Sequence, residues 1–114
     1  MLLIPLLCRV ESNNDTFAIG DDGDAVGILQ IHRIVIEDVN HLYGTDFNPV
    51  DRTYEGKSQL ICLLYLSYYG RQYYLDTGKL PTQEVLARIW NGGPKGYKKE
   101  STLKYWNKIK RAHK

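Results

Sequence analysis

Apolar residues recur at helical spacing along most of the 114-residue chain. In residues 2–12 they stand at i, i+1, i+4, i+5 and i+8, which predicts an amphipathic helix. Pro5 is compatible with this helix only in its first turn, because a proline further along would remove a backbone hydrogen bond. A second helix is predicted over about residues 34–43, and Gly44 ends it.

A long helix is predicted over about residues 54–75. Between Leu60 and Tyr69 it is apolar nearly all round, which predicts a central buried helix. Another helix opens at residues 80–82 (Leu-Pro-Thr) and ends at residues 91–94 (Asn-Gly-Gly-Pro).

Ser101 is expected to cap a last helix. Three of its apolar residues are expected to face inward, and its C-terminal part is rich in cations, which the helix dipole favours there. The inward residues are Leu103, Trp106 and Ile109, and the cations are Lys108, Lys110, Arg111 and Lys114.

Residues 13–24 and 45–51 are predicted to be loops from their composition. Residues 25–31 form an apolar run that is too short for its periodicity to distinguish a helix from a strand. We therefore expect a mainly α-helical fold with at most a very small β element after the first helix. At 13.2 kDa, the whole chain, residues 1–114, is expected to form one domain.

Composition narrows the possible functions. The chain has 43% hydrophobic and 25% charged residues, as in an ordinary globular protein. Its formal charge of +2 is too small an excess to argue for a nucleic-acid partner, so we expect none. The basic last helix, with Tyr105 and Trp106, leaves a helical DNA-binding domain as a weaker alternative.

The apolar start at residues 1–8 lacks a basic n-region and a small-residue cleavage site, and it is far shorter than the roughly 20 residues that span a bilayer. The apolar run at residues 60–66 is too short as well. We expect no export signal and no membrane segment in this sequence. The abrupt apolar beginning is typical of the mature form of a longer precursor.

The two cysteines, Cys8 and Cys62, both lie in apolar stretches and are expected to be small buried residues, with a disulfide between them as the alternative. The three histidines lack the spacing of a metal site, so we expect no metal and no cofactor. The acidic residues 21–24 lack the ligand spacing and terminal Glu of a calcium loop, which makes them a solvated turn.

Glu11 is the first candidate for chemistry. At about 100° per residue it projects between Leu7 and Ile4, inside the apolar arc of its helix. A carboxylate there must be paired or partly desolvated with a raised pKa, which suits a general acid near neutral pH. The alternative is a helix-end Glu that simply reaches solvent.

Three segments place Glu11 in a family context. Residues 11–12 (Glu-Ser), 27–31 (Gly-Ile-Leu-Gln-Ile) and 87–92 (Ala-Arg-Ile-Trp-Asn-Gly) resemble, in order, the E-S, G-L-M-Q and A-Y-N-A-G motifs of the lytic transglycosylase and goose-type lysozyme superfamily. Their order and spacing make the combination specific, and the resemblance spans about residues 2–106.

The resemblance implies a lysozyme-like fold whose cleft binds the glycan strands of peptidoglycan. It implies that Glu11 protonates the glycosidic oxygen between MurNAc and GlcNAc. Ser12 would orient Glu11 or touch the sugar, and Gln30 would bind substrate or the catalytic carboxylate. Asn91 would hold an N-acetyl group or a sugar hydroxyl, and Gly27 would let the backbone approach a ligand closely.

The chain departs from the family pattern at two positions. Trp90 replaces the usual Tyr, so the phenolic support of the acid must come from elsewhere, with Tyr97 or Tyr105 as candidates. His32 stands where goose-type lysozymes carry a water-positioning carboxylate, while Asp21 matches another acidic position.

Two reactions remain open. In a lytic transglycosylase the C6 hydroxyl of the sugar attacks and leaves a 1,6-anhydro end, and Glu11 alone suffices. In a hydrolytic lysozyme water attacks, oriented by Asp21 or, less favourably, by Asp24 or His32. Because one water-positioning carboxylate is missing, the sequence favours transglycosylation.

A peptidoglycan-binding module without activity is the alternative from another class. The resemblance further implies a monomer acting in the bacterial cell wall or periplasm, as a secreted, machine-associated or phage-associated protein.

Overall fold

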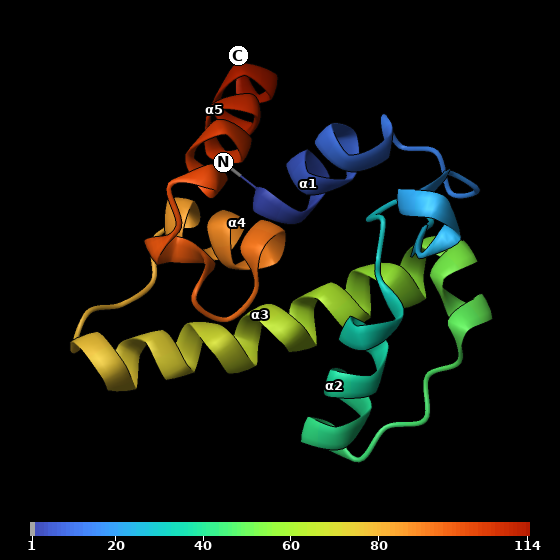
Figure 1. Ribbon diagram of the computed structural model, residues 1–114, viewed down its shortest axis with the longest axis horizontal. Helices are drawn as coiled ribbons and strands as arrows, with labels where there is room; N and C mark the ends of the chain where they lie inside the picture. Colours follow the sequence, from blue (N-terminus) through green and yellow to red (C-terminus); the bar gives the residue numbers. More distant parts are fainter. Residues whose placement is uncertain (1) are drawn as a thin grey trace.

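The computed structural model describes residues 2–114; Met1, the first residue of the apolar start, lies outside them. Most of these residues are helical, as the sequence predicts (Figure 1). The α-helices are α1 (Leu3–Ser12), α2 (Arg33–Tyr43), α3 (Glu55–Thr77), α4 (Gln83–Gly92) and α5 (Ser101–His113). Three short 3₁₀ helices are η1 (Asp21–Gly23), η2 (Pro49–Thr53) and η3 (Gly96–Lys98). Strands β1 (Ile19–Gly20) and β2 (Ala25–Val26) pair antiparallel and confirm the expected small β element.

Helix α3 crosses the molecule and separates two groups of elements (Figure 1). Helices α1, α4 and α5 contact one another on one side, while α2 and the η2 turn contact α3 towards its N-terminal half. The β1–η1–β2 hairpin lies beyond the C-terminal end of α1 (Figure 1). The space between these two groups is where the candidate site lies.

One face of α3 forms the middle of the core. Its residues Ile61, Cys62 and Tyr65 are buried, but Leu60 and Leu63 are 44% and 51% exposed. The prediction of a helix buried all round is therefore wrong. The physical reason is that the other elements contact only parts of the surface of α3, so apolar residues between these contacts remain exposed.

The ends of two helices differ in how they are capped. Thr82 caps α4 by accepting a hydrogen bond from the Val85 backbone N–H. Ser101, in contrast, is the first residue of α5 and makes no side-chain cap, so the predicted cap is wrong.

Helix α5 is also rotated relative to the prediction. Leu103 is 41% exposed and Trp106 is half-buried, whereas Thr102, Tyr105 and Ile109 are buried. The reason is that the hydroxyls of Thr102 and Tyr105 find partners inside the protein, which makes the burial of two polar groups possible.

Both cysteines are buried as free thiols, which confirms the expectation of two small buried residues. Burial raises the pKa of the Cys8 thiol to about 11, and it also raises the pKa of Cys62. Over residues 2–114, no helix combines the length and the apolar character that crossing a membrane requires.

Candidate active site

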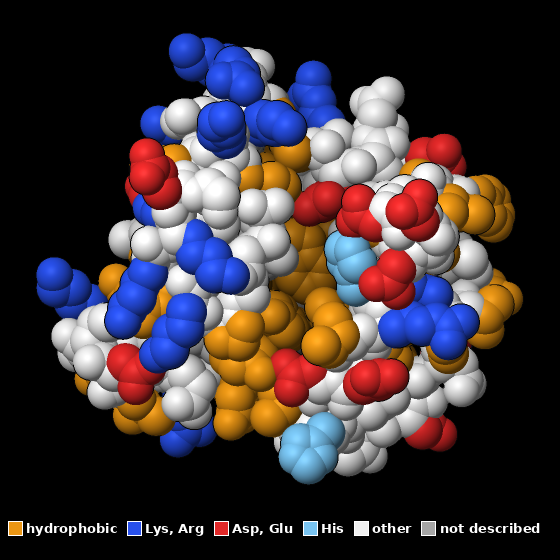
Figure 2. Space-filling model, viewed as in Figure 1, with side chains coloured by type: hydrophobic (Ala, Val, Ile, Leu, Met, Phe, Trp, Pro, Cys, Tyr) orange, Lys and Arg blue, Asp and Glu red, His pale blue; other side chains and the backbone are white. Residues whose placement is uncertain are grey.

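A cleft of about 280 Å³ lies between the two groups of elements. It is built from the C-terminal end of α1, the η1 turn, the segment leading into α2, and the C-terminal end of α4. Figure 2 shows the molecule hollowed near its centre, with acidic and histidine side chains along one edge and hydrophobic side chains within the hollow. Six predicted site residues line this cleft together with Ile31 and Val35: Glu11, Asp21, Gln30, His32, Trp90 and Asn91.

Glu11 lies half-buried at one wall of this cleft. The Tyr105 hydroxyl donates a hydrogen bond of 2.6 Å to its Oε2. Desolvation by burial raises the pKa of Glu11, and the charge of Asp21 adds to this effect; the Tyr105 hydrogen bond and the charge of His32 partly oppose it. The net direction is upward, which leaves the carboxyl better able to donate a proton than an ordinary glutamate.

Trp90 has no phenolic hydroxyl to support Glu11. Tyr105 therefore supplies the hydroxyl that contacts the acid. Burial and the adjacent Glu11 carboxylate raise the pKa of Tyr105 far above its ordinary value, so this hydroxyl remains a neutral donor. Tyr97, the other candidate, lies elsewhere: its ring packs edge to face on Tyr73, with centroids 4.8 Å apart.

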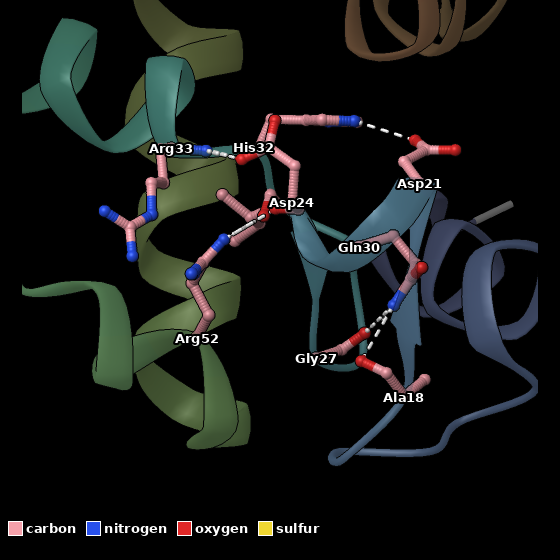
Figure 3. Close-up of polar contacts among 9 residues, drawn as sticks. Ala18, Asp21, Asp24, Gly27, Gln30, His32, Arg33 and Arg52 are labelled. Carbon is pink, nitrogen blue, oxygen red and sulfur yellow. Dashed lines mark hydrogen bonds and ion pairs between the residues drawn. The ribbon is translucent and has the colours of Figure 1, made fainter.

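Asp21 and His32 form a pair in the lining of the same cleft. The Nε2 of His32 lies 2.8 Å from Oδ2 of Asp21 (Figure 3). Asp21 begins the η1 turn with a positive φ of 49°, a conformation that acidic and amide side chains tolerate better than most. The structure thus brings a second carboxylate into the same cleft as Glu11.

Gln30 lines the cleft, but its side-chain amide donates both hydrogens to backbone carbonyl oxygens. Its Nε2 donates to the carbonyl oxygens of Ala18 and Gly27, at 3.1 and 3.0 Å (Figure 3). These bonds brace the hairpin, and they leave only the side-chain oxygen to accept a hydrogen bond from a ligand.

Trp90 and Asn91 reach the cleft from the last turn of α4. The Trp90 indole packs edge to face against Tyr65, with ring centroids 5.6 Å apart, so its orientation is held by the core. Asn91 is exposed at the rim, where its amide can both donate and accept. Aromatic faces and neutral amides are the groups that sugar recognition uses.

Comparison with known proteins shows which family the chain belongs to. No family model matches the chain. A lysozyme from Magallana gigas is 31% identical over 105 residues, which cover 90% of this chain and 72% of that protein. The chain belongs to the lysozyme family.

Other similarities agree with this assignment. Invertebrate-type lysozyme 6 of Caenorhabditis elegans is 50% identical over 46 residues, which cover 39% of this chain and 33% of that protein. A chain in the crystal structure of Aeromonas hydrophila PliI in complex with Meretrix lusoria lysozyme superposes with a TM-score of 0.77 at 25% identity, covering 94% of this chain and 84% of that one. The lysozyme-like fold implied by the sequence motifs is thereby confirmed, whereas the lytic transglycosylase and goose-type assignment stays a prediction.

Two other predicted residues of this lysozyme lie outside the cleft lining. Ser12 Oγ donates to the Ile28 carbonyl oxygen at 2.8 Å and accepts from the Asp15 backbone N–H at 3.1 Å, so it ties the end of α1 to the following loops. A Cβ on Gly27 would lie 1.9 Å from the Arg52 carbonyl oxygen. The close approach at Gly27 is therefore to another part of the chain rather than to a ligand.

Arg52 is the structural residue that the sequence analysis missed. It is only 5% exposed, and its guanidinium donates to three carbonyl oxygens. Nη1 donates to Asp24 at 2.7 Å (Figure 3) and to Ile31 at 2.8 Å, and Nε donates to Pro49 at 2.8 Å. Arg52 thereby holds the segment that carries Asp21 and His32 against the N-terminal end of α3. Burial lowers the pKa of Arg52 below its ordinary value.

One sequence signal for this brace existed. Asn48 and Asp51 form a reciprocal capping box at the start of η2, which is a recognisable Asn-x-x-Asp spacing. That pattern predicts an ordered turn before the long helix. It does not reveal that the next residue, Arg52, points across to the hairpin.

A larger hollow, of about 680 Å³, lies between the start of α1, α3 and α4. Its lining is mostly aliphatic and aromatic, and no carboxylate belongs to it. We therefore assign the chemistry to the smaller cleft around Glu11. Within residues 2–114, no cluster of three or more His, Cys, Asp or Glu side chains is arranged to hold a metal ion.

Proposed function

We propose that this lysozyme hydrolyses the β-1,4 bond between MurNAc and GlcNAc in peptidoglycan, with Glu11 as the general acid. The observation that carries the proposal is the half-buried Glu11, bonded to Tyr105 and with a raised pKa, in one cleft with the carboxylate of Asp21. The named relatives of this chain are lysozymes, which supports the same bond as the target.

Glu11 is suited to the first proton transfer. A general acid must be protonated at the working pH and must lose its proton to the leaving oxygen, and a raised carboxyl pKa serves both needs. Tyr105 engages only Oε2, so Oε1 is free to face the glycosidic oxygen. After bond cleavage, the same hydrogen bond stabilises the Glu11 carboxylate.

Asp21 is the reason to prefer hydrolysis over transglycosylation. The sequence favoured transglycosylation because His32 stands where a second water-positioning carboxylate is expected, although Asp21 was already a candidate for this role. Asp21 lines the cleft together with Glu11, and its contact with His32 through Oδ2 leaves Oδ1 for the water, which supports hydrolysis with a single orienting carboxylate. We propose that the water oxygen bonds to the MurNAc C1 atom as the bond from C1 to the glycosidic oxygen breaks; the water proton passes to Asp21, and the glycosidic oxygen takes the proton of Glu11.

The remaining cleft residues are proposed to orient the sugars. Asn91 would bind an N-acetyl group or hydroxyl, the oxygen of Gln30 would accept from a hydroxyl, and Trp90 would form an aromatic wall. The protein is proposed to act as a monomer, as the family resemblance implies. The substrate implies action in the bacterial cell wall or periplasm.

One experiment tests the proposal directly. Purified peptidoglycan is digested in H₂¹⁸O by the protein, by Glu11→Gln and by Glu100→Gln, which removes an exposed carboxylate elsewhere. We expect ¹⁸O at the new reducing ends, loss of fragment release by at least 100-fold in Glu11→Gln, and normal release by Glu100→Gln.

Three outcomes would contradict it. Anhydro ends without ¹⁸O would assign transglycosylation instead. Unchanged release by Glu11→Gln would remove Glu11 as the acid. Binding of sacculi without any soluble fragments from the unmodified protein would identify a binding module without activity.

A further inference from the structure

Charge is strongly segregated along this chain. Residues 1–57 contain ten Asp and Glu against four Lys and Arg, whereas residues 58–114 contain eleven Lys and Arg against three Asp and Glu. The near-neutral total therefore conceals an acidic N-terminal half and a basic C-terminal half. Such asymmetry is an electrostatic feature that a partner can recognise.

Helix α5 has four Lys and Arg and no Asp or Glu. Lys104, Lys108 and Arg111 stand at i, i+4 and i+7, on one side of the helix, and all three are exposed. Arg9 of α1 joins them, because its Nη1 donates to the Ala112 carbonyl oxygen at 3.3 Å. We call these four residues the α5 basic stripe. Figure 2 shows Lys and Arg side chains gathered over α5, near the C-terminus.

The stripe is free to bind a ligand. Among the ion pairs within residues 2–114, none involves a member of the stripe. Like charges four residues apart on a helix repel one another, so Lys104 and Lys108 oppose helix formation. Neither lies in the last turn of α5, so the helix dipole does not account for them, and the expectation that it would account for Lys108 is wrong. The stripe thus keeps several positive charges close together without ion-pair partners, although they repel one another. This arrangement indicates an anionic partner.

The stripe is also connected to the candidate active site. Tyr105, which bonds Glu11, belongs to the same helix, and Lys108 follows it by one turn. The charge of Lys108 acts on the Glu11 carboxyl, whose pKa it helps to lower. Tyr105 and Lys108 therefore link the stripe to the residue that we propose as the acid.

We propose that the α5 basic stripe binds an anionic phosphodiester polymer of the bacterial cell wall while the cleft holds the glycan strand. Lysine and arginine are suited to phosphate oxygens, and their spacing of about one helical turn, roughly 5 Å, is compatible with phosphates separated by short linkers. This inference rests on the proposed function, because it takes the cell wall as the target.

The test measures binding rather than cleavage, and uses Glu11→Gln throughout so that the wall stays intact. Bacterial walls that retain poly(glycerol phosphate) are compared with the same walls after its chemical removal. At low ionic strength, we expect about tenfold tighter binding to the retained walls, and we expect added salt to abolish the difference. Adding Lys104→Gln and Arg111→Gln should remove this preference, whereas the matched pair Arg71→Gln and Lys79→Gln, on exposed positions of and after α3, should keep it.

The outcomes separate the two proposals. Equal binding to both walls, or a preference that survives Lys104→Gln with Arg111→Gln, would overturn the role of the stripe. Stronger competition by duplex DNA than by soluble poly(glycerol phosphate) at equal phosphate concentration would also overturn it, in favour of a nucleic-acid surface. Binding to the stripped walls by the protein that also carries Lys104→Gln and Arg111→Gln reports on the cleft, so its absence would count against the proposed function instead.

Discussion

The hydroxyl of Tyr105 donates to Oε2 of Glu11 at 2.6 Å and joins two residues that lie 94 positions apart in the chain. The bond gives a partly desolvated carboxyl one fixed partner, so its orientation towards the cleft is set by α5. Because the pKa of Tyr105 is raised far above its ordinary value, the hydroxyl stays a neutral donor in both charge states of Glu11. In this lysozyme, α5 thus completes a site whose other residues come from earlier in the chain.

Tyr105→Phe should shift the pH profile upward. The hydrogen bond from Tyr105 lowers the pKa of Glu11, so its loss raises that pKa further. A general acid is active below its pKa, and we therefore expect the alkaline limb of kcat/KM to move to higher pH. Tyr97→Phe, remote from Glu11, is the control, and a shift of the limb to lower pH would contradict the assignment.

Glu11→Gln should change how stability depends on pH. Because the folded protein raises the pKa of Glu11 above the ordinary 4.5, the protonated carboxyl is favoured by folding. Its contribution is fully present below pH 4.5 and is lost as pH rises through the raised pKa. At pH 8 we expect Glu11→Gln to unfold at a higher urea concentration than the unmodified protein, and we expect this advantage to disappear near pH 4. Glu100→Gln serves as the matched variant, and an advantage that grows towards acid pH would have the wrong sign.

Asp21→Asn should abolish hydrolysis and leave the fold intact. Asparagine keeps the contact with His32 but cannot take a proton from water, so we expect kcat to fall by about 100-fold or more. The neighbouring Asp22 is exposed and does not line the cleft, which makes Asp22→Asn a suitable comparison. Similar rates for both variants, measured as reducing ends released from peptidoglycan, would exclude Asp21 from the reaction.

Arg52→Met should destabilise the protein and loosen the hairpin. The substitution keeps the apolar part of the side chain but removes the guanidinium from the carbonyl oxygens of Asp24 and Ile31, of which the Ile31 oxygen still accepts from the Val26 backbone N–H. We expect the free energy of unfolding to fall by about 2–4 kcal/mol, and amide exchange in the hairpin to accelerate. Arg71→Met removes an exposed arginine of α3 and should cost less than about 0.5 kcal/mol. Equal effects of the two substitutions in urea denaturation would argue against the brace.

Much of the cleft could be predicted because its residues lie in short motifs. Gln30 and Asn91 were singled out by the spacing of their neighbours, and both line the cleft with Glu11. Ser12 and Gly27 belong to the same motifs, but they support the loops around the cleft instead. A motif marks residues that a family of sites needs, and it does not separate a group that faces the ligand from one that holds the backbone in place.

The sequence by itself determined the helices and the side of α1 on which Glu11 lies, because both follow from relations within a few residues. Apolar spacing sets which face of a helix is buried, and that spacing put Glu11 on the apolar side of α1. Only the tertiary structure decided that Tyr105 rather than Tyr97 reaches Glu11, that Arg52 braces the hairpin, and that α5 turns Leu103 outward. These contacts depend on how distant helices pack and rotate against one another, and the periodicity of a single segment carries no information about that.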